Sequence, residues 1–168
     1  MNQLLNILKQ SPLTKWFAIT AIIVVIDQIT KQIADNSLTL YERVSVMPFF
    51  NITLAYNEGA AFSFLADAGG WQRWFFIILT LIISTILIIW LKKSESKLEQ
   101  LAISFVLAGA IGNNLIDRPL FGHVIDFLDF YYKTHHWPAF NVADMAISGG
   151  VMLLIISTFT HKPDNTKD

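Results

Sequence analysis

Two aspartates, Asp126 and Asp144, lie on either side of the start of an apolar segment near Phe140. Two carboxylates brought together in a poorly hydrated site cannot easily both ionise, so one stays protonated as an acid while the other acts as a base toward a shared water. That division of labour suits hydrolysis of an amide without a metal or a covalent nucleophile. The alternative is structural: Asp144 caps a helix and Asp126 is a solvated loop carboxylate.

Other polar side chains gather at the ends of the apolar segments, where a lipid-facing position would not tolerate them. Asp27 and Lys31 are spaced i and i+4, so they can pair within one helix. In the alternative interpretation this pair only neutralises itself and lets the helix end at the interface. Arg118 can form a charge-assisted hydrogen bond to a carboxylate or a lipid phosphate. We expect these side chains to share one site with the two aspartates, together with Asn114, Asp117 and Asn141.

A zinc site is an alternative use of the same region. His123 and Asp126 are spaced i and i+3, with His135 and His136 in the same segment, and such side chains can bind zinc. The spacing matches no H-E-x-x-H pattern. The absence of cysteine excludes thiolate ligands, a thiolate nucleophile and disulfides. We therefore expect neither a metal nor another cofactor.

The composition is that of a membrane protein. Hydrophobic residues make up 54% of the 168 residues and charged residues 15%, with a mean hydropathy of +0.49, against about 25% charged residues in soluble domains. A spanning helix needs about 20 largely apolar residues. Four windows qualify, and they predict spans at 16–33, 71–91, 98–116 and 140–159. We therefore expect an all-α membrane protein that forms one domain over residues 1–168. The net charge of −1 and the lack of a basic stripe argue against nucleic acid.

The distribution of lysine and arginine predicts the orientation. With the amino terminus inside, the outer segments hold few basic residues, and the inner segments hold Lys9, Lys15, Lys92, Lys93, Lys97, Lys162 and Lys167. Both termini are therefore expected in the cytoplasm, with the polar cluster near the outer face. A secretory signal is the alternative for the first window, but no A-x-A site follows it and charged residues interrupt its end.

The segment between the first two spans, residues 41–66, breaks the helical pattern. Apolar residues alternate with polar or small ones from Phe50 to Asn57, which predicts a half-buried strand. Asn57-Glu58-Gly59 predicts a turn, with a second alternation at Phe62 and Phe64. We expect a small extracytoplasmic β-sheet, apolar side toward the membrane; a plain connecting loop is the alternative. Segment 119–139 is rich in aromatic residues, which suits the level of the lipid headgroups.

Five motifs, in order along nearly the whole chain, resemble those of the bacterial lipoprotein signal peptidases, the type II signal peptidases, which are aspartic proteases of the inner membrane. The motifs are Asp27-Gln28-Ile29-Thr30-Lys31, Asn57-Glu58-Gly59-Ala60-Ala61-Phe62, Asn114-Leu115-Ile116-Asp117-Arg118, Gly122-His123-Val124-Ile125-Asp126-Phe127 and Phe140-Asn141-Val142-Ala143-Asp144. One departure is visible. The family commonly has Gly directly before the Asn of its N-x-x-D-R run, where this chain has Asn113, and this leaves open how closely the third helix packs there.

The resemblance implies four helices with a small outer β-sheet cradle and a catalytic pair formed by Asp126 and Asp144. The implied substrate is a prolipoprotein whose lipobox cysteine carries diacylglycerol, cut on the amino side of that cysteine. We expect a monomer surrounded by membrane lipids. The residues implied in positioning the pair and the substrate, or in supporting the site, are Asp27, Lys31, Asn114, Asp117, Arg118 and Asn141.

The segment from Asn57 through Gly59 to Phe64 is expected to lie over the site and clamp the peptide, because it combines strand alternation with a glycine turn. Two rival functions stay open at this point. A proton or ion pathway also uses intramembrane carboxylates, although it would need ionisable groups through the full depth of the bilayer. A non-catalytic membrane scaffold would need neither aspartate.

Overall fold

The computed structural model describes residues 13–59, 65 and 68–160. Its long helices are α2 (Thr14–Ser37), α3 (Trp71–Lys93), α4 (Lys97–Ala110) and α6 (Val142–Thr160), and α4 continues into the π-helix η2 (Ile111–Asp117) and the short helix α5 (Arg118–Phe121). Within the described residues, four helical stretches are long and apolar enough to cross a membrane. The four predicted spans are thus confirmed, although the third continues as far as Phe121.

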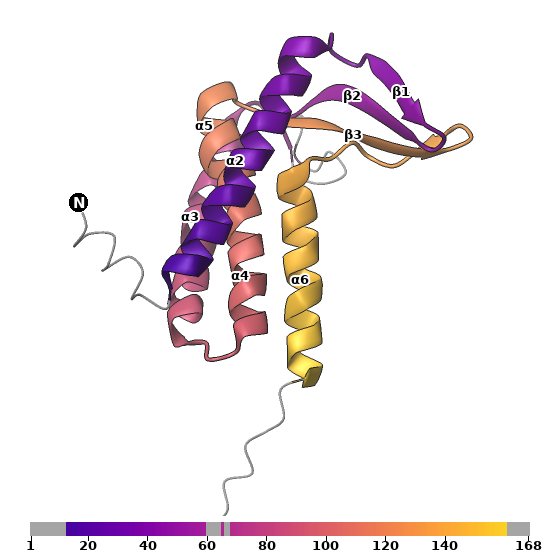
Figure 1. Cartoon of the computed structure of the whole chain (residues 1–168). Helices are drawn as coiled ribbons and strands as arrows, with labels where there is room; N and C mark the ends of the chain where they lie inside the picture. Colours follow the sequence, from indigo (N-terminus) through magenta and orange to yellow (C-terminus); the bar gives the residue numbers. More distant parts are fainter. Residues whose placement is uncertain (1–12, 60–64, 66–67, 161–168) are drawn as a thin grey trace, which may run out of the picture.

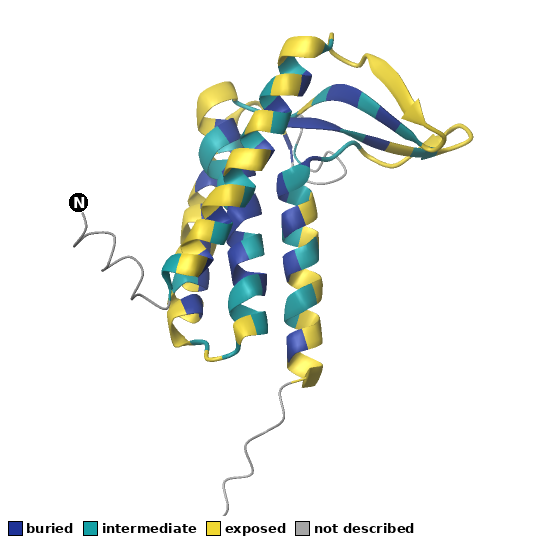
Figure 2. Ribbon diagram, in the orientation of Figure 1, coloured by how far each residue is buried: buried dark blue, intermediate teal, exposed yellow. Residues whose placement is uncertain are grey.

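The helices stand side by side (Figure 1), and the exposed positions along them (Figure 2) include many large apolar residues. On α3, Ile78, Ile82 and Ile86 are exposed, whereas Thr80 and Ser84 are buried. Within a bilayer lipid covers the apolar face, and small or polar residues suit the helix contacts. This pattern therefore agrees with a helix that faces lipid on one side.

Helix α4 is the most deeply buried helix, as its dark blue ribbon in Figure 2 shows. Glycines let α6 approach it closely. A Cβ atom at Gly109 would collide with the backbone oxygen of Ala143 and the side chain of Ile147, and one at Gly150 would lie 2.7 Å from the backbone oxygen of Ala102. Because α6 begins beside Asp144, this contact also fixes the depth of that carboxylate.

Gly109→Ala should lower the stability of the protein by about 1–3 kcal/mol, because the added methyl group forces α4 and α6 apart. Thermal unfolding in detergent would measure the loss. Gly149→Ala is the matched control, since its Cβ would meet only Phe105 at an ordinary 3.9 Å. Equal unfolding temperatures for the two variants would contradict the proposed close contact.

The strands form one antiparallel sheet in the order β1-β2-β3-β4 that projects to one side beyond the start of α6 (Figure 1). They are β1 (Arg43–Met47), β2 (Phe50–Asn57), β3 (Val124–Tyr132) and β4 (His135–His136). The small sheet predicted in the first outer segment is confirmed. Its central partner β3, however, comes from the second outer segment, for which no strand was predicted. The alternation predicted at Phe62 and Phe64 lies outside the described residues.

The burial of β2 differs from the simple alternation expected. Asn51 and Thr53 are buried, whereas Phe50 and Ile52 are only half-buried. The polar side chains are satisfied inside the sheet: Asn51 donates to Asp129 at 2.9 Å and Thr53 to the Glu42 backbone oxygen at 2.7 Å. Phe50 and Ile52 are therefore left partly uncovered by protein, as expected of side chains that rest on lipid, whereas Leu54 is buried.

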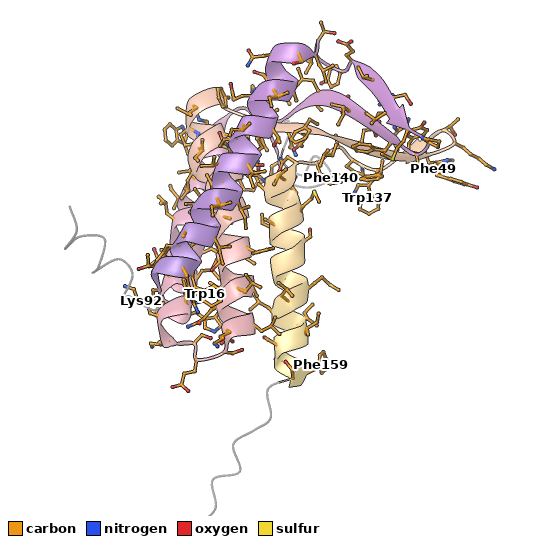
Figure 3. The ribbon with its side chains drawn as sticks, in the orientation of Figure 1. Trp16, Phe49, Lys92, Trp137, Phe140 and Phe159 are labelled. Atoms are coloured by element: carbon orange, nitrogen blue, oxygen red, sulfur yellow. The ribbon has the colours of Figure 1, made fainter. Side chains whose placement is uncertain are left out.

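The sheet and the far end of the bundle mark the two faces of the molecule. Phe140 lies beside the sheet, whereas Trp16, Lys92 and Phe159 lie at the opposite end of the helices (Figure 3). Since α2 ends and α6 begins at the sheet end (Figure 1), the polar residues at those helix termini meet on one side.

Candidate active site

Asp144 lies in the first turn of α6 and is held there by Asn141. The Asn141 side-chain oxygen accepts from the Asp144 backbone N–H at 2.9 Å, and the Asp144 carboxylate accepts from the Asn141 backbone N–H at 3.2 Å. This reciprocal pattern is a capping box with an aspartate in the fourth position. The structural alternative considered for Asp144 is therefore true, and it fixes the orientation of the carboxylate.

Asp126 lies on β3 and is buried, with 3% of its surface exposed. The Asn141 side-chain amide donates to one of its oxygens at 2.7 Å, and the Asn57 amide donates to the other at 3.2 Å. Asp126 is thus not a solvated loop carboxylate. Asn141 touches both aspartates, which brings together the two side chains predicted to act as a pair.

The environment of Asp126 favours its protonated form. Burial, and next the negative charge of Asp144, raise the pKa of Asp126 from its ordinary value of 3.8 to about 7, against the opposing effect of the hydrogen bonds from Asn57 and Asn141. A carboxyl group with a pKa near neutrality can hold a proton and release it during a reaction. Asp126 therefore has the properties required of a general acid.

Lys31 forms a fully buried ionic cluster with two carboxylates. Its Nζ lies 2.8 Å from Asp27 and 2.7 Å from Asp117, and all three residues are 0% exposed. The predicted pairing of Asp27 with Lys31 is confirmed. Asp117 joins them from the third span, so the pair does not simply neutralise itself at the end of α2. A buried charge needs such partners, because removing it from water is costly.

Both carboxylates of this cluster also hold the backbone next to the aspartate pair. Asp27 accepts from the backbone N–H of Ala143 at 2.8 Å, and Asp117 accepts from that of Ile125 at 3.4 Å. Ala143 directly precedes Asp144, and Ile125 directly precedes Asp126. The Lys31 cluster thereby connects α2 and η2 to the backbone on which both aspartates stand.

Arg118 holds the turn that follows β2. Its guanidinium donates to the backbone oxygen of Glu58 at 2.9 Å and to that of Gly59, and it lies 4.6 Å from the ring centre of Phe76. Its Nε donates to the Asn114 side chain at 2.7 Å. Among the described residues, Arg118 therefore donates to an amide oxygen and to two backbone oxygens, and not to the carboxylate considered from the sequence. The turn at Gly59 is consequently fixed between Arg118 and the Asn57 contact to Asp126.

Residues 19–160 match the family model for signal peptidase (SPase) II. The chain belongs to the signal peptidase II family. It is 55% identical over 156 residues to the lipoprotein signal peptidase of Hydrogenovibrio crunogenus, covering 92% of this chain and 89% of the relative. It is 52% identical over 143 residues to that of Cupriavidus pinatubonensis, covering 84% and 80%.

Two solved structures of bacterial membrane enzymes share the fold of this chain. One bacterial membrane enzyme has 34% sequence identity and a TM-score of 0.81, covering 94% of each chain. Another has 36% identity and a TM-score of 0.79, covering 90% of this chain and 96% of its own. Together with the family model and the relatives, they confirm the resemblance drawn from the five motifs.

Sequence reasoning missed one residue of this signal peptidase II site. Asn113 is 7% exposed, and it contacts both Lys31 at 2.7 Å and Asp144 at 2.8 Å, whereas Asn114 contacts Arg118. The contact with Asp144 that the motif led us to expect of Asn114 is therefore made by its neighbour Asn113. The signal was the departure from the family pattern at Asn113.

The histidines of the second outer segment are used elsewhere. His123 stacks on Tyr56 with ring centres 4.0 Å apart, and burial lowers the pKa of His123. His136 contacts Asp129 at 2.8 Å on the sheet, away from the aspartate pair. Within residues 13–59, 65 and 68–160, no group of three His, Cys, Asp or Glu side chains is placed to hold a metal ion.

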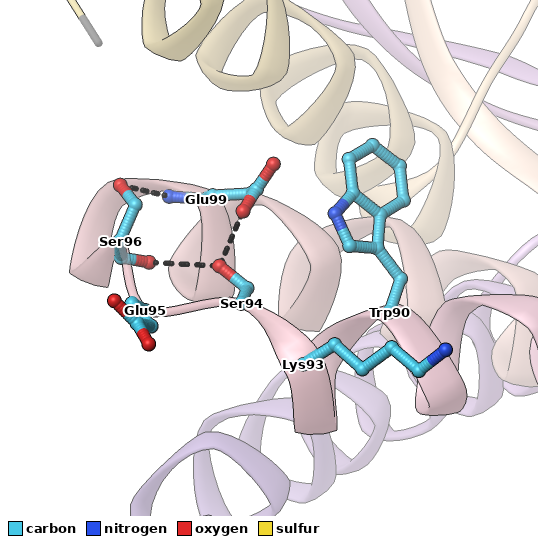
Figure 4. Close-up of a pocket in the computed structure, with 6 residues that line it drawn as sticks. All are labelled: Trp90, Lys93, Ser94, Glu95, Ser96 and Glu99. Atoms are coloured by element: carbon cyan, nitrogen blue, oxygen red, sulfur yellow. Dashed lines mark hydrogen bonds between the residues drawn. The ribbon is translucent and has the colours of Figure 1, made fainter. Parts of the chain in front are cut away.

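An open pocket lies between α3 and α4, at the end of the bundle opposite the sheet (Figure 4). Its polar contacts belong to the helix start: Ser96 caps α4 by accepting from the Glu99 backbone N–H at 3.4 Å, and Ser94 donates to the Glu99 carboxylate. This pocket has no connection to the aspartate pair.

Proposed function

We propose that this chain is an intramembrane aspartic endopeptidase that removes signal peptides from diacylglyceryl-modified prolipoproteins, with Asp126 and Asp144 as its catalytic pair. Membership of the signal peptidase II family supports the reaction. The single observation that carries the residue assignment is the contact of Asn141 with both carboxylates. No metal or other cofactor enters the proposed reaction.

The two aspartates divide the proton transfers. Asp144 takes a proton from a water molecule as the water oxygen bonds to the scissile carbonyl carbon. Asp126 gives its proton to the leaving nitrogen as the carbon–nitrogen bond breaks. The proton gained by Asp144 then passes to Asp126, which restores the starting state. The raised pKa of Asp126 supports giving it the acid role. The hydrogen bonds from Asn113 and Asn141 to Asp144 support its role as the ionised base.

The site would lie near the outer face of the bacterial inner membrane, with both termini in the cytoplasm. The lysine-rich segments support this orientation, because Lys92 lies at the end of the bundle away from the sheet (Figure 3). A monomer could admit a signal helix sideways from the bilayer. The acyl chains of the substrate would then stay in lipid while its scissile peptide reached the aspartates beneath the turn at Gly59.

The decisive experiment incubates the purified protein with a diacylglyceryl-modified lipobox peptide, with and without a chelator. Cleavage on the amino side of the lipidated cysteine, unchanged by the chelator, is the expected result. The same peptide without the diacylglyceryl group should be cleaved poorly. Loss of cleavage with the chelator, or cleavage elsewhere in the peptide, would contradict the proposal.

The pH dependence should follow the proton on Asp126. Since this carboxyl must be protonated to act as the acid and its pKa is about 7, kcat/KM should fall about tenfold per pH unit above neutrality. Initial rates from about pH 5 to about pH 9 would measure the profile, which reports the coupled pair. Asn57→Ala removes a hydrogen bond that favours ionised Asp126, so the fall in kcat/KM should begin at a higher pH in this variant. A profile still flat at about pH 9 would contradict the assignment.

A further inference from the structure

The π-helix η2 separates two neighbouring asparagines onto different partners. Asn113 and Asp117 both reach Lys31, at 2.7 Å each, whereas Asn114 accepts from Arg118, which also donates to the turn after β2. Segments of π-helix are rare and frequently occur at functional sites. One face of η2 therefore contacts the buried Lys31 cluster, and the other contacts Arg118, which binds the turn at Gly59.

We propose that Asn113 is a positioning residue that couples the buried Lys31 ammonium to Asp144 and keeps that carboxylate in its reactive, ionised orientation. The inference rests on the proposed function of the aspartate pair. It assigns the role to Asn113 and not to Asn114, the residue that the motif implied.

The direction of the hydrogen bonds supports this role. The Asn113 oxygen accepts from Lys31, which leaves its amide N–H to donate to the Asp144 carboxylate at 2.8 Å. The amide orientation is therefore set by the ammonium, which has only donors to offer. Asp144 receives its second donor from the Asn141 backbone N–H. Two such donors favour the ionised carboxylate, because hydrogen bonds to the charged form stabilise it relative to the neutral acid.

A purely structural role for Asn113 makes a different prediction. If it only filled space and satisfied Lys31, its loss would lower stability and leave the chemistry of the folded fraction unchanged. If it positions Asp144, its loss also changes kcat and the acid limb of the pH profile, where the base becomes protonated. These readouts separate the two roles even when a variant is less stable.

The test compares the native protein with Asn113→Ala and Asn113→Ser on the diacylglyceryl peptide. Asn113→Ala should lower kcat about ten- to a hundredfold at nearly unchanged KM, the loss expected for one hydrogen bond to a charged group. The acid limb of its pH profile, where the base becomes protonated, should move to a higher pH by about one unit. Asn113→Ser, whose hydroxyl can still donate, should have a kcat between those of the native protein and Asn113→Ala. Asn36→Ala is the control, since Asn36 is exposed and donates only to its own helix at 2.7 Å from the Gln32 oxygen.

Asp144→Asn, measured in the same series, separates failure of this inference from failure of the proposed function. If Asp144→Asn is inactive while Asn113→Ala keeps the native kcat and acid limb, the positioning role is wrong and the catalytic pair stands. If Asp144→Asn cleaves normally, the proposed catalytic pair is wrong. Thermal unfolding of each variant gives the folded fraction by which its rate is corrected.

Discussion

Asp126→Asn and Asp144→Asn should each lower kcat for the diacylglyceryl peptide by about 10²- to 10⁴-fold, the usual contribution of a positioned general acid or base. Asparagine keeps the size of the side chain and one acceptor oxygen, so the hydrogen bonds from Asn141 can largely persist. What disappears is the ability to hold and transfer a proton. Initial rates under saturating peptide would measure the effect.

The Asp126 variant should also be recognisable by its stability. In the folded protein the pKa of Asp126 is about 7, against 3.8 ordinarily. The folded state therefore keeps a proton that the unfolded chain releases, and stability is lost as the pH rises from about 4 to about 7. Because asparagine cannot ionise, Asp126→Asn should be more stable than the native protein at about pH 8, by on the order of 1–3 kcal/mol.

An inactive but stable Asp126→Asn variant would exclude misfolding as the reason for lost cleavage. Asp35→Asn is a suitable control, because Asp35, near the carboxyl end of α2, accepts from the Tyr56 hydroxyl at 2.7 Å and makes no hydrogen bond to either aspartate among the described residues. It should cleave at the native rate. Native cleavage rates for both Asp126→Asn and Asp144→Asn would instead show that the cleavage does not depend on this pair of aspartates.

Lys31→Met should destabilise the protein by about 3–5 kcal/mol, because it leaves Asp27 and Asp117 buried without their counter-charge. Cleavage should be lost as well, since these carboxylates hold the backbone at Ala143 and Ile125. Thermal unfolding in detergent and the peptide assay would measure the two effects. Lys92→Met is the matched control, because Lys92 is exposed at the other end of the bundle (Figure 3).

A combined variant tests whether charge imbalance causes the loss. Adding Asp27→Asn and Asp117→Asn to Lys31→Met removes all three charges but keeps an oxygen for each backbone N–H. A neutral cluster of similar volume often restores stability, so the combined variant should unfold at a higher temperature than Lys31→Met alone. If Lys31→Met unfolds at the same temperature as Lys92→Met, the cluster contributes little to the stability of the fold.

Much of the fold could be predicted because hydropathy is a local property. Each span is an apolar run long enough for a bilayer, and β2 alternates over Phe50–Asn57. Strand β3 was missed because both of its faces are largely buried from Val124 to Phe127. Its sequence therefore lacks the alternation that identifies a half-buried strand.

By itself the sequence determined the four spans, the family motifs and the identity of the two aspartates proposed to react, because residue type and order along the chain carry that information. Only the tertiary structure decided which groups surround them. Asp117 joins Lys31 across 86 positions of sequence, and Asn113 reaches Asp144 across 31. Spacing along one helix cannot reveal such contacts, because they depend on how helices pack and on the π-helical turn that directs Asn113, rather than Asn114, toward the aspartate pair.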